Sequence, residues 1–259
     1  MTASSKFEQL LAEGNSEPTE GWDFSWFKDR ATEERPSWKY SQALCQRVAR
    51  ADAVFDVQTG GGERLAEILS QLPTNPRVIV ASESWSDNVK IAKQNLHRFD
   101  VSIVEIEDKS DFPFPDESFD LVSSRHPTLT LWTEIARVLQ PGGTYFSQQV
   151  GKGTNSELTN FMMGPQPVSD SRSARRAAAI ASSVGLNVID MREESLPVVF
   201  FDVGAVVYFL RKVIWTVPDF TVEKYKKRLF EMHKHIEKDG GFLSHSQRFL
   251  IEAKKRNST

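Results

Sequence analysis

One stretch determines how this chain folds: Ala53-Val54-Phe55-Asp56-Val57-Gln58-Thr59-Gly60-Gly61-Gly62-Glu63. An apolar run reaches an aspartate, passes through a glycine-rich turn, and leads into residues 64–69, where the apolar side chains have helical spacing. A strand, a tight turn and a helix in this order bring backbone N–H groups close to a ligand, and glycines leave no side chain in the way. The stretch therefore predicts a loop that binds a nucleotide-type cofactor.

Short apolar runs alternate with helical segments along most of the chain, which indicates parallel strands joined by right-handed crossovers. The expected strands are residues 54–57, 77–81, 101–106, 119–123, 144–150, 187–192 and 246–253. The expected helices are residues 38–50, 62–72, 86–98, 129–139, 171–184 and 221–238, with a short helix between the third and fourth strands. This pattern predicts an α/β fold: a sheet with helices on both faces and a ligand beyond the carboxyl ends of its strands.

Two regions lie outside this alternation. Residues 1–50 are expected to form an N-terminal helical lead-in, and residues 51–259 the main domain, with a cofactor half at 51–150 and a substrate-side half at 151–259. The apolar and aromatic residues 198–220 are expected to be an insertion before the last strand. An apolar, aromatic wall of this kind suits a small organic ligand.

The composition limits the classes of function. The formal net charge is −3, so no general basic field is available to attract nucleic acid. Residues 1–21 contain no apolar segment of signal-peptide length, and the longest apolar stretch, 196–210, includes Asp202 and is too short to cross a bilayer. The single cysteine, Cys45, cannot form an intrachain disulfide. We therefore expect a cytoplasmic protein without a membrane partner, whose oligomeric state the sequence does not give.

Carboxylates follow the second and third expected strands. Glu83 lies 27 residues after Asp56, where a carboxylate can accept hydrogen bonds from both hydroxyls of a ribose. Asp108 follows the third strand, where a carboxylate can accept from the exocyclic amine of an adenine. Two further motifs frame the fourth strand, FPFPDESFDLV at residues 112–122 and RVLQPGG at residues 137–143.

In this order and spacing, the glycine-rich loop, Glu83 and the two motifs resemble class I S-adenosylmethionine-dependent methyltransferases. Within them the chain is similar to the ubiquinone/menaquinone-biosynthesis-like group of small-molecule methyltransferases, in a bacterial branch of that group. The resemblance covers about residues 50–150. It implies a Rossmann-like, seven-stranded, mostly parallel sheet whose last strand is antiparallel, and it implies S-adenosyl-L-methionine as the cofactor.

The resemblance also implies which residues would surround the cofactor. Asp56, Thr59, Gly60 and Gly62, with Gln58 among them, would hold the methionine part, and Glu83 the ribose. Ser84 and Trp85 would lie along the adenine, Asp108 and Lys109 would meet its edge, and Ser124 and Arg125 would line the route to the methyl group.

Gln58 departs from the family pattern, because the related loops have a glycine at this position. A glutamine takes up space and resists positive φ. Its side chain is expected either to point away from the cofactor or to donate a hydrogen bond to the cofactor carboxylate.

On the acceptor side, methyl transfer from a sulfonium is an in-line displacement that depends mainly on holding the acceptor near the methyl carbon. It requires no metal, and we expect none. His126 follows the fourth strand and is the candidate for a general base or a substrate-orienting group, with Arg125 beside it. Either Gln148 or Gln149 should face the same cleft by strand alternation. Asp202, within apolar surroundings, is expected to be a helix N-cap.

The leading hypothesis is thus a methyltransferase that uses S-adenosyl-L-methionine and acts on a small-molecule acceptor. One alternative is an RNA-base methyltransferase, which would need a basic cleft. Another, motivated by Gln58, is a non-catalytic protein that binds a ligand or a partner on the same fold. An oxidoreductase with a dinucleotide cofactor is disfavoured, since Gln58 and Glu63 occupy positions where its motif has glycine.

Overall fold

The computed structural model describes residues 3–19 and 24–257, and the chain divides into two compact units. Unit 1 combines Met1–Arg35, Gly153–Ser169 and Ser195–Gln247, whereas unit 2 combines Pro36–Lys152, Asp170–Glu194 and Arg248–Thr259. Each unit is assembled from separate segments of the chain. The lead-in at residues 1–50 and the main domain at 51–259, with halves at 51–150 and 151–259, stay predictions.

Unit 2 contains the predicted alternation of strands and helices. Its strands are β2 (Ala53–Val57), β3 (Val78–Glu83), β4 (Ser102–Glu105), β5 (Phe119–Arg125) and β6 (Leu139–Val150), with parts of β7 (Leu186–Phe200) and β8 (Phe242–Lys255). Its helices are α2 (Tyr40–Val48), α3 (Glu63–Leu69), α4 (Ser86–Leu96), α5 (Trp132–Val138) and α7 (Ala174–Ser183), with the short 3₁₀ helices η2 (His97–Phe99) and η3 (Asp170–Arg172).

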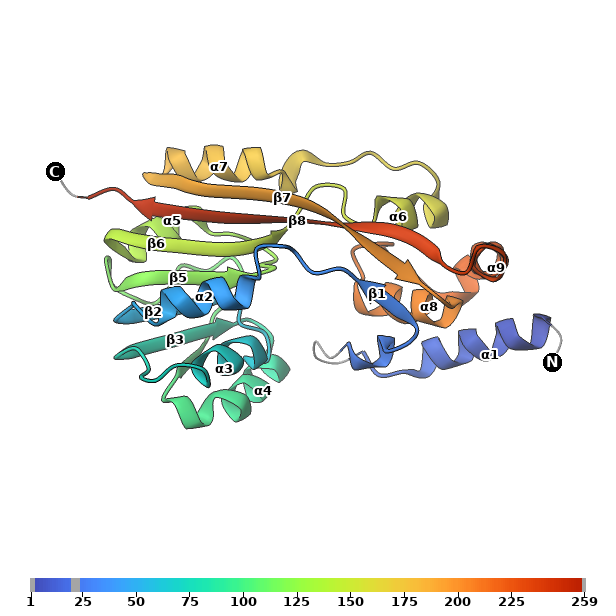
Figure 1. Cartoon of the computed structure of the whole chain (residues 1–259), viewed down its shortest axis with the longest axis horizontal. Coiled ribbons are helices and arrows are strands. Elements are labelled where there is room, and N and C mark those ends of the chain that lie inside the picture. Colours follow the sequence, from blue (N-terminus) through green and yellow to red (C-terminus); the bar gives the residue numbers. More distant parts are fainter. Residues whose placement is uncertain (1–2, 20–23, 258–259) are drawn as a thin grey trace. The chain divides into compact units, whose positions relative to one another are not determined.

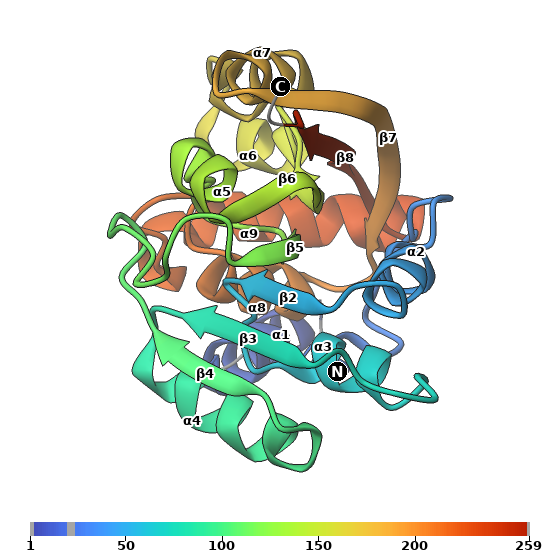
Figure 2. The ribbon, with the colours of Figure 1, turned by 90° about the vertical axis from the view of Figure 1, so that its left-hand side faces the viewer.

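The strand pairing confirms the expected fold class. Strand β2 pairs in parallel with β3 and β5, β3 with β4, and β5 with β6, whereas β6 pairs with β8 antiparallel. Figure 2 shows β4, β3, β2, β5 and β6 following one another in this order. The strand order reverses between β2 and β5, and ligands of open α/β sheets bind beyond the carboxyl ends at such a point.

The number of strands differs from the prediction. Within the described residues the sheet has eight strands, in the order β1-β7-β8-β6-β5-β2-β3-β4, and not seven. The additional strand is β1 (Ala31–Glu33), which pairs antiparallel with β7 in unit 1. A three-residue strand with two exposed side chains has no alternation long enough to recognise in a sequence.

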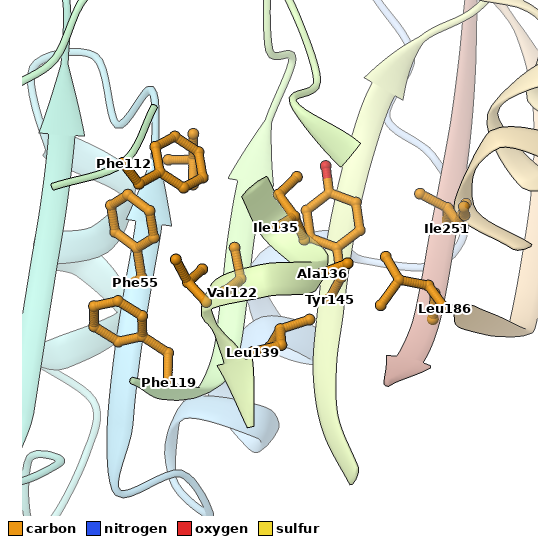
Figure 3. Close-up of a cluster of buried hydrophobic side chains, with 14 of the residues drawn as sticks. Phe55, Phe112, Phe119, Val122, Ile135, Ala136, Leu139, Tyr145, Leu186 and Ile251 are labelled. Atoms are coloured by element: carbon orange, nitrogen blue, oxygen red, sulfur yellow. The ribbon is translucent and has the colours of Figure 1, made fainter. Parts of the chain in front are cut away.

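Side chains of β2 alternate between two cores, because successive residues of a strand point to opposite faces of the sheet. Val54 belongs to the core formed with α2, α3 and α4, and Phe55 belongs to the core formed with α5 and α7. In the second core Phe55 lies against Phe112 and Phe119, at ring-centroid distances of 5.0 and 5.1 Å (Figure 3).

The two motifs around β5 hold each other in place. Arg137 donates from Nη1 to the Phe114 carbonyl at 2.8 Å and from Nη2 to the Phe112 carbonyl at 2.9 Å. The segment between β4 and β5 has no regular secondary structure, and the short helix predicted there is absent from it. Pro113 and Pro115 explain the difference, since proline removes a donor and restricts the residue before it.

Unit 1 combines helices with short stretches of strand and has a hydrophobic core of its own. Its elements are α1 (Ala3–Ser16), the 3₁₀ helix η1 (Ser25–Phe27), β1, α6 (Ser156–Met163), α8 (Val203–Lys212), α9 (Val222–Asp239) and the remaining parts of β7 and β8. Helix α1 packs along α8 (Figure 1). Phe7 and Leu11 of α1 are buried there with Val206 of α8 and Leu229 of α9.

In the part of the chain that the structure describes, no helix is both long and apolar enough to cross a membrane. Asp202 caps α8, as predicted: its carboxylate accepts from the Ala205 N–H at 2.8 Å.

Candidate functional site

The candidate site starts from a buried carboxylate on β2. Asp56 lies opposite Ser123 of β5, and Ser123 Oγ donates to Asp56 Oδ1 at 2.6 Å. Burial raises the pKa of the Asp56 carboxyl, and the hydroxyls of Ser123 and Thr59 oppose part of that rise. Asp56 is therefore held at the switch point of the sheet in an environment that disfavours an uncompensated negative charge.

Ser123 lies beside Asp56, one residue before Ser124, which was predicted to line the route to the methyl group. The Ser124 hydroxyl is instead in a buried cluster, 2.8 Å from the Tyr145 hydroxyl and 2.9 Å from Ser147 Oγ. Neighbouring residues of a strand point to opposite faces, so only one of these serines can share a face with Asp56. The register between β2 and β5 selects Ser123, and a sequence alone does not give that register.

Glu83, at the end of β3, fixes the glycine-rich turn. Its Oε2 accepts from the Gly60 N–H at 2.8 Å, and its Oε1 accepts from the N–H groups of Ser84 and Trp85 at 3.0 and 3.1 Å. Glu83 is only 7% exposed, whereas the Trp85 ring beside it is 62% exposed. A carboxylate oxygen has two lone pairs, so Glu83 Oε2 keeps capacity for a further donor such as a hydroxyl.

The glycines of the turn satisfy both conformation and packing. Gly60 and Gly62 have φ values of +66° and +75°. A Cβ on Gly62 would lie 2.7 Å from Leu96 Cδ1 of α4. The conformation and packing of the turn therefore favour glycine at these positions, whether or not a ligand binds there.

The buried hydroxyl of Thr59 lies beside the Asp56 carboxylate. The Thr59 N–H donates to the Ser82 carbonyl at 2.8 Å. Thr59 Oγ1 helps to lower the pKa of the Asp56 carboxyl, but its geometry is not that of a regular hydrogen bond. A buried hydroxyl that is poorly paired, three residues after Asp56, suits a polar ligand group.

Gln58 adopts a left-handed conformation, with φ +56°, and points toward the loop that follows β5. Its Oε1 accepts from the Thr128 N–H at 2.7 Å and lies 3.0 Å from Thr128 Oγ1, while its Nε2 donates to the Leu129 carbonyl at 2.8 Å. Thr128 Oγ1 is also 2.8 Å from Asp108 Oδ2. We call this chain of contacts the Gln58–Thr128–Asp108 link; it joins the segments after β2, β4 and β5.

The Gln58–Thr128–Asp108 link shows which orientation the Gln58 side chain adopts. The structure has the amide directed toward the exposed loop after β5, with both of its ends engaged by the backbone of 128–129. Asp108 is part of the link through Thr128, and the neighbouring Lys109 is exposed in a turn.

His126 also has a left-handed backbone, with φ +53°, and its N–H donates to the Gln148 carbonyl at 2.7 Å. Its Nε2 lies 2.8 Å from Gln148 Nε2, and the Oε1 of the same amide accepts from Trp38 Nε1 at 2.8 Å. Burial, followed by the nearby positive charges of Arg125, Arg248 and Arg64, lowers the pKa of His126 well below its usual value. His126 is therefore a neutral imidazole at neutral pH.

Of the two glutamines at the end of β6, Gln148 contacts His126, whereas Gln149 Nε2 donates to the Tyr145 hydroxyl at 3.2 Å. Arg125 is exposed at the end of β5. Gln148 is thus the glutamine of the expected pair that contacts His126. Trp38, the partner of Gln148, was not connected with His126 by the sequence, since it lies 110 residues from Gln148.

Chemically, the carboxyl ends of β2, β3 and β5 bring together a buried acid, a carboxylate bound to a glycine-rich turn, and a neutral imidazole. The first two suit a ligand that carries an ammonium group and hydroxyls. Among the described residues, no cluster of three or more His, Cys, Asp and Glu side chains is arranged to hold a metal ion.

Comparison with known proteins points in the same direction. Residues 55–147 match the family model described as "Methyltransferase domain". A malonyl-[acyl-carrier protein] O-methyltransferase from Marinomonas sp. (strain MWYL1) is 23% identical over 252 residues, which cover 89% of this chain and 92% of that protein. The 27-O-demethylrifamycin SV methyltransferase from Amycolatopsis mediterranei (strain S699) is 27% identical over 171 residues, 61% of this chain and 57% of that protein.

Among solved structures, the YcgJ protein from Bacillus subtilis is similar in fold, with a TM-score of 0.60 and 16% sequence identity. The alignment covers 85% of this chain and 99% of that chain. The match to the family model thus lies on β2 to β6, where the candidate site is located, and the similarity of fold extends beyond these strands.

Proposed function

We propose that this chain, whose residues 55–147 match a methyltransferase domain, is a class I S-adenosylmethionine-dependent methyltransferase that transfers a methyl group from S-adenosyl-L-methionine to a small-molecule acceptor. The observation that carries the proposal is the buried pair of Asp56 and Ser123 at the switch point of the sheet, with the Thr59 hydroxyl beside it. The relatives named above, which act on an acyl-carrier-linked malonyl group and on a rifamycin, support an acceptor outside the nucleic acids.

The residues present fit the cofactor. Asp56 has one carboxylate oxygen engaged by Ser123, which leaves acceptor capacity for an ammonium group, and the buried Thr59 hydroxyl beside it forms no regular hydrogen bond. In our proposal these two residues hold the methionine part of the cofactor. Glu83 would receive the ribose hydroxyls while it continues to fix Gly60.

The adenine would be held by the next segments of the domain. The exposed ring of Trp85 provides a surface for stacking, and Asp108, positioned by Thr128, can accept from an amine. Ser84 and Lys109 border the same region, and the Gly62 backbone shapes the turn. Ser124 is not part of this proposal, because its hydroxyl belongs to the Tyr145 cluster.

When bound, the cofactor supplies a methyl carbon on a cationic sulfur; a lone pair of the acceptor forms the new bond to that carbon as the carbon–sulfur bond breaks, and the electron pair stays on sulfur. The protein's contribution is to hold the acceptor in line with that bond. His126 and Arg125, at the end of β5, are the residues that we propose for orienting the acceptor.

Calorimetric titration of the full chain with S-adenosylmethionine and S-adenosylhomocysteine tests the proposal. We expect micromolar binding by the wild type and a loss of at least about tenfold in Asp56→Asn, which removes the charge that pairs with the ammonium group. Asp52→Asn is the matched control, because Asp52 precedes the same strand but is exposed and paired with Arg77. It should bind like the wild type.

The result that contradicts the proposal is a folded wild-type protein that binds neither compound. Binding by Gln58→Gly in the absence of wild-type binding would favour the alternative, a non-catalytic ligand- or partner-binding protein on this fold. Binding by the wild type would justify a screen of acceptors with a radiolabelled methyl group.

A further inference from the structure

A chain of hydrogen bonds connects His126 to the segment before α2. Trp38 Nε1 donates to Gln148 Oε1 at 2.8 Å, and Gln148 Nε2 lies 2.8 Å from His126 Nε2. Trp38 is 6% exposed and Gln148 is 3% exposed, so water does not compete for these contacts. The backbone contributes as well, because the His126 N–H donates to the Gln148 carbonyl at 2.7 Å.

The chemistry of the donors determines the direction of every bond in this chain. An indole N–H can only donate, so the atom of the Gln148 side chain that faces Trp38 must be the oxygen. The other end of that amide is then the NH₂ group, which also can only donate. His126 Nε2 must therefore accept, which requires an unprotonated Nε2 and places the ring proton on Nδ1.

The charges around the ring favour the same neutral state. Arg125 lies next to His126 in sequence, Arg248 lies on β8, and Arg64 lies in the first turn of α3. Together with burial these cations lower the pKa of the imidazole well below 6.5, since a second positive charge near them is unfavourable. Gln148 itself is uncharged and adds no compensating negative charge.

The second ring nitrogen is the one available to a ligand. No described residue forms a hydrogen bond with His126 Nδ1, and the His126 side chain as a whole is half-buried. In the tautomer derived above this nitrogen carries the proton.

We propose that Trp38 and Gln148 are positioning residues that hold His126 as the Nδ1–H tautomer, so that His126 offers a hydrogen-bond donor, and not a general base, to the methyl acceptor. The second half of this inference rests on the proposed function. A donor at this position recognises an acceptor molecule with an oxygen lone pair, such as a carboxylate, a carbonyl or a phenolate. A carboxylate or a phenolate has no proton to lose on methylation, so such acceptors need no base.

The tautomer is measurable without any ligand. In the full chain labelled with ¹⁵N-histidine, correlation of the ring nitrogens with the ring carbon-bound protons distinguishes a protonated from an unprotonated nitrogen. The His126 signals are identified by their loss in His126→Asn, which separates them from His97, His233, His235 and His245. We expect a protonated Nδ1 and an unprotonated Nε2 at pH 7, and no titration of this ring near pH 6.5.

Two variants test the role of the partners. In Gln148→Glu the carboxylate can only accept, so it keeps the bond from Trp38 but requires a proton on His126 Nε2. Trp38→Phe removes the indole donor and keeps an aromatic ring, which frees the Gln148 amide to turn over. We expect Nε2 to be protonated in the first variant and the two tautomers to be mixed in the second.

Gln149→Glu is the matched control, because it introduces the same charge one residue further along β6, where the side chain contacts Tyr145. It should leave the His126 signals unchanged. Thermal denaturation of each variant shows whether the fold is retained.

An Nε2–H tautomer in the wild type would overturn the inference, as would a wild-type His126 that titrates near pH 6.5. An unchanged tautomer in Trp38→Phe would remove Trp38 from the assignment, and an unprotonated Nε2 in Gln148→Glu would remove Gln148. These outcomes are independent of cofactor binding, so calorimetry with S-adenosylmethionine fails or succeeds separately.

Discussion

Asp56 is placed where its charge is useful to a ligand and unfavourable to the folded protein. Its carboxyl is buried and has a raised pKa, so the folded state binds a proton more tightly than the unfolded state does. By linkage, the stability of the protein falls as the pH rises from the unfolded-state value of about 3.9 through the folded-state value. The loss is complete once the pH lies above the folded-state value.

Replacing Asp56 by asparagine removes that charge and keeps an oxygen to accept from Ser123. We expect Asp56→Asn to raise the free energy of unfolding at pH 7 by about 1 kcal/mol, roughly 2–4 °C in Tm, while it loses the cofactor. The gain should disappear as the pH approaches 4. Urea denaturation of both proteins across this pH range measures the difference, and a destabilised Asp56→Asn at pH 7 would show that Asp56 is structural.

Gln58 anchors the loop after β5 through hydrogen bonds between its side-chain amide and the backbone of Thr128 and Leu129. In Gln58→Gly the Thr128 N–H loses its acceptor, while the strain of a non-glycine residue at φ +56°, about 1 kcal/mol, is relieved. We expect total stability to change by less than about 1 kcal/mol, but amide hydrogen exchange at Thr128 to accelerate about tenfold or more.

Gln58→Glu provides the comparison for this experiment. It retains an acceptor for the Thr128 N–H and should keep most of the protection of that amide. Equal exchange rates at Thr128 in the wild type and in Gln58→Gly would mean that the Gln58–Thr128–Asp108 link does not hold the loop in solution.

At the scale of residues, the sequence predicted which positions end the strands but not what their side chains contact. Asp56 and Glu83 could be found because a carboxylate after a buried strand is visible in the sequence, and both lie at the predicted edge. Gln58 could be recognised as unusual, but its partners lie 70 and 71 residues away in a loop without regular spacing. The tautomer of His126 depends on Trp38, which no local pattern connects to it.

Among the elements, α1 depends on a close approach of two backbones. A Cβ on Gly14 would lie 2.2 Å from the Gly204 carbonyl oxygen of α8, and a Cβ on Gly204 would lie 2.7 Å from the Leu10 carbonyl oxygen. Glycine at both positions lets α1 lie directly on α8, where Phe7 and Leu11 are buried.

This contact predicts an inverted effect for a substitution that usually helps a helix. Glycine to alanine in a helix normally stabilises by about 0.5–1 kcal/mol. We expect Gly14→Ala to destabilise the protein by about 1–3 kcal/mol instead, because the backbones must separate. Asn15→Ala, at the exposed next residue of the same helix, should change stability by less than about 0.5 kcal/mol. A stabilised Gly14→Ala in chemical denaturation would contradict the close packing of α1 on α8.

The elements that the sequence predicted well are those with strong periodicity, and α9 illustrates this: residues 221–238 were predicted and Val222–Asp239 is observed. Helix α1 was not predicted separately within the lead-in, since charged and polar residues surround the few side chains that it buries. Strand β6 was expected to begin at residue 144 but starts at Leu139, because the pairing with β5 is irregular between Phe119 and Leu121. A bulge of this kind lets a strand continue through Pro141 and the two glycines that read as a stop.

For the molecule as a whole, the distribution of charge separates a small acceptor from RNA. The net charge is −3, the basic residues of α9 are interspersed with acids, and two of them form ion pairs. Lys226 pairs with Glu8 at 2.8 Å, and Arg228 pairs with Glu231 at 2.9 Å. Proteins that hold an RNA backbone concentrate unpaired cations along one surface, since binding comes largely from the release of counterions.

We therefore expect no binding of a labelled 20-nucleotide RNA hairpin at 150 mM salt, that is, a Kd weaker than about 10⁻⁴ M by fluorescence anisotropy. The sample must first be shown to bind S-adenosylmethionine, so that a negative result is not due to inactive protein. A tighter Kd would instead favour an RNA-base methyltransferase if the logarithm of the binding constant also falls steeply with the logarithm of the salt concentration. The salt dependence is the informative quantity, because a folded protein of this charge that binds RNA must do so through a local basic patch, and that patch would then identify the acceptor side of the site.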